Sequence, residues 1–198
     1  MTPDLILALT GFAIATTFSP GPNNVMLMAS GANFGLRRSV PHMAGIGLGV
    51  MSLVAASGAG LARLFDLWDW LRPVLAVAAG LYLLYLAWRI ATAAPKLKNS
   101  EPAGRPLTLW QAAAFQWVNP KAWAMAVSAT TLYLPDRGMG SLAVGVLVFG
   151  LVSVPSTLIW TSFGRAVGRW LTSPERLRGF NRVMAGLIVL SLVPIVLG

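Results

Sequence analysis

The sequence predicts an all-α integral membrane protein with six transmembrane helices, arranged as an inverted repeat of three plus three. Apolar residues make up 56% of the 198-residue chain and charged residues only 11%, whereas a soluble domain carries about 25% charged residues. Long charge-free runs recur along the chain, and basic residues gather in every second connection between them. Lipid is therefore the expected solvent of most of the chain.

Six apolar segments are expected to cross the membrane. Three of them contain no Asp, Glu, Lys or Arg: 5–36, 39–62 and 138–164. Each of these exceeds the roughly 20 residues that a helix needs to cross a hydrocarbon core. The remaining three predicted spans are 73–88, 106–135 (interrupted only by Lys121) and 183–198. Flanking arginines can lengthen the shorter spans by extending toward the headgroups.

The distribution of basic residues predicts the orientation of the chain. The first, third and fifth connections carry net charges of +2, +3 and +4, and the second and fourth are neutral. Because cytoplasmic loops are enriched in Lys and Arg, both termini are expected on the periplasmic side. The formal charge of +9 is thereby explained by topology, and no nucleic-acid partner is predicted. The first apolar run is too long for a signal peptide, so we expect it to be retained.

A single transmembrane domain is expected over residues 1–198, divided into two halves. Residues 93–106 form the predicted cytoplasmic linker, which is polar and contains Pro95, Pro102 and Pro106. The two repeat halves are then 1–92 and 107–198. Because each half has an odd number of spans, the second half enters the membrane in the opposite sense, as in an inverted-topology repeat.

The first and fourth predicted spans carry helix-breaking residues near their centres. The breakers are Pro20, Gly21 and Pro22 in the first span and Asn119 with Pro120 in the fourth. Proline removes a backbone donor, and glycine permits strained dihedral angles. An unbroken helix over residues 5–36 would be about 48 Å long, against a hydrocarbon core of about 30 Å. Breaks at matching positions of two repeats indicate a transport site, and simple kinks are the alternative.

At these residues the chain resembles the LysE/RhtB family of amino-acid exporters. The matching stretches are Ser19-Pro20-Gly21-Pro22-Asn23-Asn24, Gly35 followed by Arg37, and the segments 44–49, 82–88 and 115–122. The motifs end at Ala122, whereas size and span layout are similar over the full length. The resemblance implies a bacterial inner-membrane exporter of amino acids or their derivatives. It also implies a homodimer driven by the proton motive force.

Lys121 is the only charged side chain well inside a predicted span. A charge at the bilayer centre costs roughly 2.5 kcal/mol or more, and no carboxylate lies at that depth to neutralise it. Its partner must be water, backbone carbonyls or the ligand. We expect Lys121 to bind the carboxylate of the substrate. Proton coupling through Lys121 is a second hypothesis, and a lysine that extends to the membrane surface is a third.

Amide side chains surround both predicted breaks. Asn23, Asn24 and Asn119 are expected to contact the ligand or to satisfy the backbone groups that the breaks set free. Gln116, one turn before Pro120, is expected to line the same cavity.

Sequence position and spacing predict roles for His42 and for two pairs of glycines. We expect His42 at the membrane boundary, where an interfacial role is favoured over a proton relay. Gly45 and Gly49 have the spacing that permits close helix approach, within one protomer or across a dimer. Gly164 and Gly168 share this spacing at the basic edge, where the argument for packing is weaker.

Several function classes conflict with the sequence. A metal-cation pore would need acidic rings or soft ligands, whereas the spans supply a lysine, so the solute is expected to be anionic or zwitterionic. The absence of cysteine eliminates a thiol–disulfide carrier, and no nucleophile has a base at its depth. No enzyme, cofactor or metal site is predicted. A transporter of another small anionic or zwitterionic solute and a non-transporting structural subunit remain as alternatives.

Overall fold

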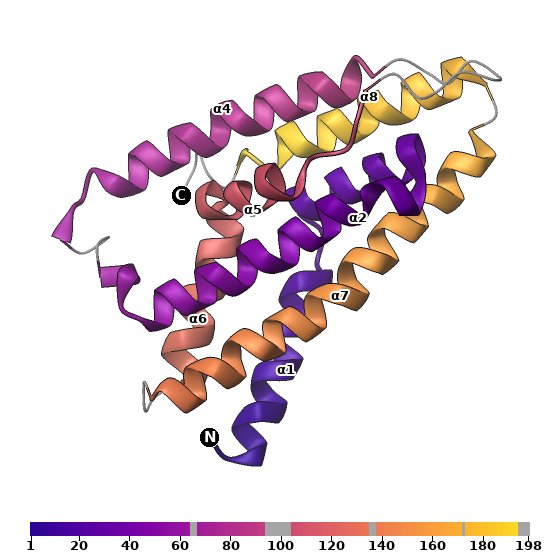
Figure 1. The fold of residues 1–198 in the computed structure, drawn as a ribbon. Helices are drawn as coiled ribbons and strands as arrows, with labels where there is room; N and C mark the ends of the chain where they lie inside the picture. Colours follow the sequence, from indigo (N-terminus) through magenta and orange to yellow (C-terminus); the bar gives the residue numbers. More distant parts are fainter. Residues whose placement is uncertain (64–66, 94–103, 135–137, 172, 194–198) are drawn as a thin grey trace.

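The computed structural model describes residues 1–63, 67–93, 104–134, 138–171 and 173–193, and these residues form helices without strands. The helices in chain order (Figure 1) are α1 (Pro3–Phe18), α2 (Pro22–Gly58), the short 3-10 helix η1 (Leu61–Arg63), α4 (Leu71–Ala91), α5 (Leu109–Val118), α6 (Pro120–Tyr133), α7 (Met139–Trp170) and α8 (Pro174–Leu190). The predicted all-α class is confirmed. Most of the predicted linker lies outside the described residues.

Three of the described helices are long and apolar enough to cross a membrane alone: α2, the Pro73–Ala91 part of α4, and α7. The apolar helix α1 is shorter, with 16 residues. The helix α8 begins at Pro174, well before the expected start at residue 183, because Ser173 caps it by accepting a hydrogen bond from the Arg176 backbone N–H. The end of that predicted span, residues 194–198, lies outside the described residues.

The helix α7 has polar side chains on its buried face and apolar side chains on its exposed face. Its buried face carries Ser153, Ser156 and Thr157, and its exposed face carries large apolar side chains such as Leu151 and Ile159. A soluble helix bundle has the opposite arrangement, with apolar residues inside. Oxygen-bearing side chains inside and hydrocarbon outside are the arrangement expected for a protein dissolved in a bilayer.

The helix α2 folds back on itself at Gly35. This residue has a φ of 76°, in the left-handed region that favours glycine. The hydroxyls of Ser30 and Ser39 lie 2.7 Å apart across the turn, although nine residues of straight helix would separate them by about 13.5 Å. The segment 22–34 therefore belongs to the first predicted span and 36–58 to the second.

Glycines set the closest helix contacts. A Cβ on Gly45 would meet the Leu109 carbonyl, and one on Gly49 would lie 2.7 Å from the Ala113 carbonyl oxygen, so this pair packs against α5 of the same chain. Gly164 and Gly168 in turn lie against the backbone of α2. This contact is part of the most extensive helix pairing in the described structure, that of α2 with α7, and it is tighter than the position of the two glycines led us to expect.

Candidate functional site

The chain leaves helical geometry at both places where the sequence predicts a break. The helix α1 ends at Phe18 and α2 begins at Pro22. The helix α5 ends at Val118 and α6 begins at Pro120, with Asn119 extended between them. Each following helix thus starts with a proline at its first position, where the missing N–H costs no hydrogen bond.

The Lys121 ammonium connects the two breaks. Its Nζ donates to the Ser19 carbonyl at 2.9 Å, to the Ser19 hydroxyl at 2.8 Å and to the Pro20 carbonyl at 3.1 Å. These bonds use all three donors of an ammonium group. They also place a positive charge at the C-terminal end of α1, where the helix dipole is negative. Of the partners that the sequence left open, backbone carbonyls are in contact, and the Ser19 hydroxyl is a further partner that the sequence did not suggest.

Asn24 and Ser156 complete the cap on α1. The Asn24 side chain donates to the carbonyls of Thr17 and Ser19 at 2.9 and 2.8 Å, and the Ser156 hydroxyl donates to the Thr17 carbonyl at 3.0 Å. Carbonyls at a helix C-terminus have no partner within their own helix, so these side chains satisfy them. Asn24 therefore serves the broken backbone, as one of its two predicted roles requires, and ligand contact remains a prediction.

The side chain of Asn119 caps the helix that follows the second break. Its Oδ1 accepts the backbone N–H of Lys121 at 3.1 Å, which makes Asn119 the N-cap of α6. An asparagine at this position satisfies one of the orphan donors of a helix N-terminus. The backbone role predicted for Asn119 is thus present, and the same bond fixes the start of the helix that carries Lys121.

Asn23 and Gln116 form a reciprocal amide pair between the two broken segments. The Asn23 amide donates to Gln116 Oε1 at 2.8 Å and the Gln116 amide donates to Asn23 Oδ1 at 3.1 Å. Gln116 is fully buried and also donates to the Ala112 carbonyl. Gln116 thus supports the pocket from behind through Asn23, and it is not among the residues that line it.

Gly21 lies at the first break, as predicted, but the expectation of a strained backbone there was wrong. Gly21 has φ 177° and ψ 176°, which is extended backbone rather than a strained conformation. Its small size is what the structure uses, because a Cβ there would lie 3.0 Å from both Cδ and Nζ of Lys121. Glycine at this position lets the ammonium approach the end of α1.

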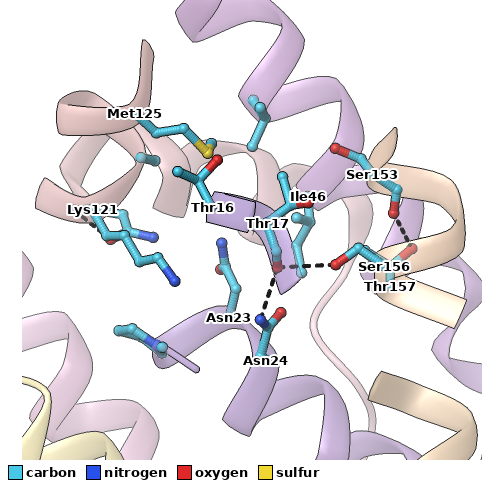
Figure 2. Close-up of a pocket in the computed structure, with 15 residues that line it drawn as sticks. Thr16, Thr17, Asn23, Asn24, Ile46, Lys121, Met125, Ser153, Ser156 and Thr157 are labelled. Carbon is cyan, nitrogen blue, oxygen red and sulfur yellow. Dashed lines mark hydrogen bonds between the residues drawn. The ribbon is translucent and has the colours of Figure 1, made fainter. Parts of the chain in front are cut away.

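One pocket of about 460 Å³, a volume that includes its open mouth, lies at the two breaks. Figure 2 shows Lys121 and Ser156 on opposite sides of this pocket, with Asn23 and Asn24 between them. The lining is Thr16, Thr17, Gly21, Pro22, Asn23, Asn24, Ile46, Val50, Asn119, Lys121, Ala122, Met125, Ser153, Ser156 and Thr157. Four predicted ligand-contact residues are therefore brought together. Thr16 and Thr17 were missed, although their place just before the first break marks the helix end that the pocket exposes.

The electrostatics of the pocket suit a zwitterion. The N-terminus of α2 has no side-chain cap, because its N-cap residue is Gly21, and helix N-termini carry a partial positive charge that attracts anions. Hydroxyl groups of Thr16 and Ser153 lie among the lining residues, and no acidic residue is among those the structure describes there. The pocket thus offers positive groups at one end and neutral oxygens elsewhere.

His42 lies apart from this pocket, and its place at the membrane boundary stays a prediction. The side chain is 2% exposed, because the turn at Gly35 folds the second segment of α2 into the protein interior. It lines a different pocket, one helical turn before Ile46.

The amide pair gives the first testable prediction. Asn23→Ala or Gln116→Ala alone leaves a buried amide without its partner and should lower the free energy of unfolding by about 1–3 kcal/mol. The double variant should be less destabilised than the sum of the two by about 0.5–3 kcal/mol. Thermal unfolding of the purified variants in detergent measures this, with Thr130→Val, whose hydroxyl bonds only within α6, as a distant control. Strict additivity would mean that the pair is not coupled.

An internal polar pocket at two interrupted helices, inside a bundle with hydrocarbon facing outward, is the arrangement of a multi-pass helical membrane transporter. The chain belongs to the LysE type translocator family, whose model matches residues 14–197. It is 32% identical to the cysteine/O-acetylserine efflux protein of Escherichia coli strain K12, with 96% of each chain covered. The protein of the same description from Shigella sonnei is similar to the same extent. No solved structure matches the chain.

Proposed function

We propose that this protein exports amino acids or amino-acid derivatives across the bacterial inner membrane by alternating access around the pocket at the two breaks. The observation that carries the proposal is the Lys121 ammonium, held between the breaks beside an uncapped helix N-terminus. The description of the relatives as cysteine/O-acetylserine efflux proteins supports amino-acid derivatives as solutes. Six spans in an inverted repeat, periplasmic termini and a homodimer belong to the same proposal.

In the proposed complex, the substrate carboxylate lies against the N-terminus of α2, next to Lys121. Its approach displaces the ammonium from the Pro20 carbonyl, the longest of its three hydrogen bonds. The substrate ammonium is then held by hydroxyl oxygens of Thr16 and Ser153 on the pocket wall. Asn23 and Asn119 are the proposed amide contacts. Binding thereby exchanges a contact within the protein for a contact to the solute, which is how a ligand shifts a conformational equilibrium.

Coupling to protons is proposed to act through Lys121, because no acidic residue lines the pocket among those the structure describes. A protonated lysine holds α1 by its three hydrogen bonds, and loss of the proton would leave two donors and a free lone pair. His42 is the second group proposed for proton transfer, from its separate position along α2.

Counterflow in proteoliposomes tests the function. Vesicles loaded with unlabelled O-acetylserine or cysteine should accumulate the labelled compound, and an imposed pH gradient should change its rate. A panel of other amino acids, lysine included, defines the substrate range. If no amino acid or derivative moves, the solute assignment fails. Transport of a different small anion in the same vesicles would favour the alternative solute, and no transport at all would favour a structural subunit.

A further inference from the structure

A second pocket lies between α2, α4 and the segment that precedes α5. It encloses about 480 Å³, its open mouth included. Its polar lining consists of Ser30, Asn33, His42, Arg89 and Arg105, and its described lining includes no acidic residue. Arg89 is half-buried and Arg105 is exposed, and no carboxylate of the described residues lines the pocket with them. The two guanidinium groups therefore give positive potential at a pocket with apolar walls, which attracts anions.

His42 is the side chain that points to a ligand. It is 2% exposed, and among the described residues neither its Nδ1 nor its Nε2 has a hydrogen-bond partner. Buried polar groups almost always have partners, and an unpaired one costs about 1–3 kcal/mol. Both nitrogens lie just below the surface of the pocket that His42 lines, so a polar molecule there would supply the missing hydrogen bond once the imidazole rotates toward it.

The two arginines retain the capacity to bind an anion. Arg89 makes one long hydrogen bond, 3.5 Å from Nη2 to the Arg105 carbonyl, and its guanidinium lies 5.8 Å from the centre of the Tyr85 ring. A guanidinium has five N–H donors in a fork that matches the two oxygens of a carboxylate. Within the described part of the chain Arg89 makes no other side-chain hydrogen bond, so most of its donors are available for a ligand.

The second pocket is a neighbour of the pocket at the breaks along α2. His42 lines the second pocket and Ile46, four residues later, lines the first. On the other segment of α2, Met26 lines the second pocket and Asn23, three residues earlier, lines the first. Residues three and four apart are neighbours on one helix face. This adjacency favours a solute that moves between the pockets over a lipid headgroup held at the edge.

We propose that the second pocket binds the carboxylate of the amino acid before it reaches the breaks, with Arg89 and Arg105 as anion ligands and His42 as the inner hydrogen-bond partner. This inference rests on the proposed function, because the ligand is the exported solute. The side-chain oxygens of Ser30 and Asn33 lie in the same lining and can accept hydrogen bonds from the substrate ammonium. The basic side of the membrane, expected to be cytoplasmic, is then the loading side.

Equilibrium binding to the purified chain tests this proposal with radiolabelled O-acetylserine and cysteine. The wild-type chain should bind two molecules, and Arg89→Gln/Arg105→Gln should bind one. Lys121→Met should also bind one, at the second pocket. The matched control, Arg176→Gln/Arg178→Gln, removes the same charge from exposed positions of α8 and should still bind two. His42→Phe should weaken the second site by about tenfold, which corresponds to about 1.4 kcal/mol.

Three results would overturn the inference, and they are distinguishable. In the first result, the wild type binds one molecule, Arg89→Gln/Arg105→Gln also binds one, and counterflow is intact. The second site is then absent, whereas the proposed function stands. Loss of co-purified phosphatidylglycerol in that variant, with amino-acid stoichiometry unchanged, assigns the pocket to lipid phosphate instead. Absence of both binding and counterflow in the wild type defeats the proposed function and this inference together.

Discussion

Lys121→Met should reduce amino-acid counterflow by about 100-fold or more, which corresponds to at least ~2.7 kcal/mol. The methionine removes the only charged group in the described lining of the pocket at the breaks and three hydrogen bonds from the end of α1. Hydrogen bonds to charged groups are each worth about 1.5–3 kcal/mol, so the apparent melting temperature should fall as well. Counterflow normalised to inserted, folded protein measures the effect.

Ser19→Ala is the matched control for Lys121→Met. It deletes one oxygen acceptor of the ammonium but keeps the charge and both carbonyl contacts. We expect this variant to lose some thermal stability and to retain most of its counterflow. If Lys121→Met transports at a wild-type rate, Lys121 has no part in the mechanism. If Ser19→Ala is as inactive as Lys121→Met, the ammonium acts by holding the end of α1 and not by binding solute.

Gly164→Ala should lower the free energy of unfolding by about 1–3 kcal/mol, the typical cost of overpacking. The added Cβ would lie 2.7 Å from the Met28 Cα, and a backbone atom can move aside only if α2 and α7 separate. Separation of these helices would open the most extensive contact of the described structure. Thermal unfolding in detergent, followed by size-exclusion chromatography, gives the shift in melting temperature.

Gly186→Ala is the control for this substitution within the same chain. A Cβ at Gly186, in α8, meets nothing within 4 Å, and alanine is favoured over glycine in a helix interior by about 0.5–1 kcal/mol. This variant should therefore be slightly more stable than the wild type. Equal melting temperatures for the two alanine variants would show that α2 and α7 do not pack as closely as described.

Local chemistry made the helix breaks predictable from the sequence. Proline cannot continue a helix, and its preferred place at the first helical position explains why α2 and α6 start at Pro22 and Pro120. The membrane character was equally predictable, because composition and charge-free runs do not depend on how the helices pack. The family resemblance followed from the same local stretches.

What the sequence did not reveal depends on packing between distant segments. The partners of the Lys121 ammonium lie about one hundred residues away in sequence, and the pairing of Asn23 with Gln116 is equally remote. His42 was expected at the membrane boundary because it follows two arginines, and nothing in the sequence indicated that its side chain is buried within the protein. A left-handed glycine inside an apolar run has no distinct compositional signal, so neither the turn nor its consequence for His42 could be derived.

The turn at Gly35 also limits which parts of the protein can move. A single non-helical residue joins the two segments of α2, and the Ser30–Ser39 contact closes the hairpin just beyond it. Both pockets take lining residues from both segments, so the hairpin forms one wall that the two pockets share. In the proposed alternating access, movement would then come from the opposite wall, to which α1 and α6 contribute Thr16, Thr17 and Lys121. The hydrogen bonds of the Lys121 ammonium to Ser19 and Pro20 join these two elements, so either these bonds would break or the two elements would move as a unit.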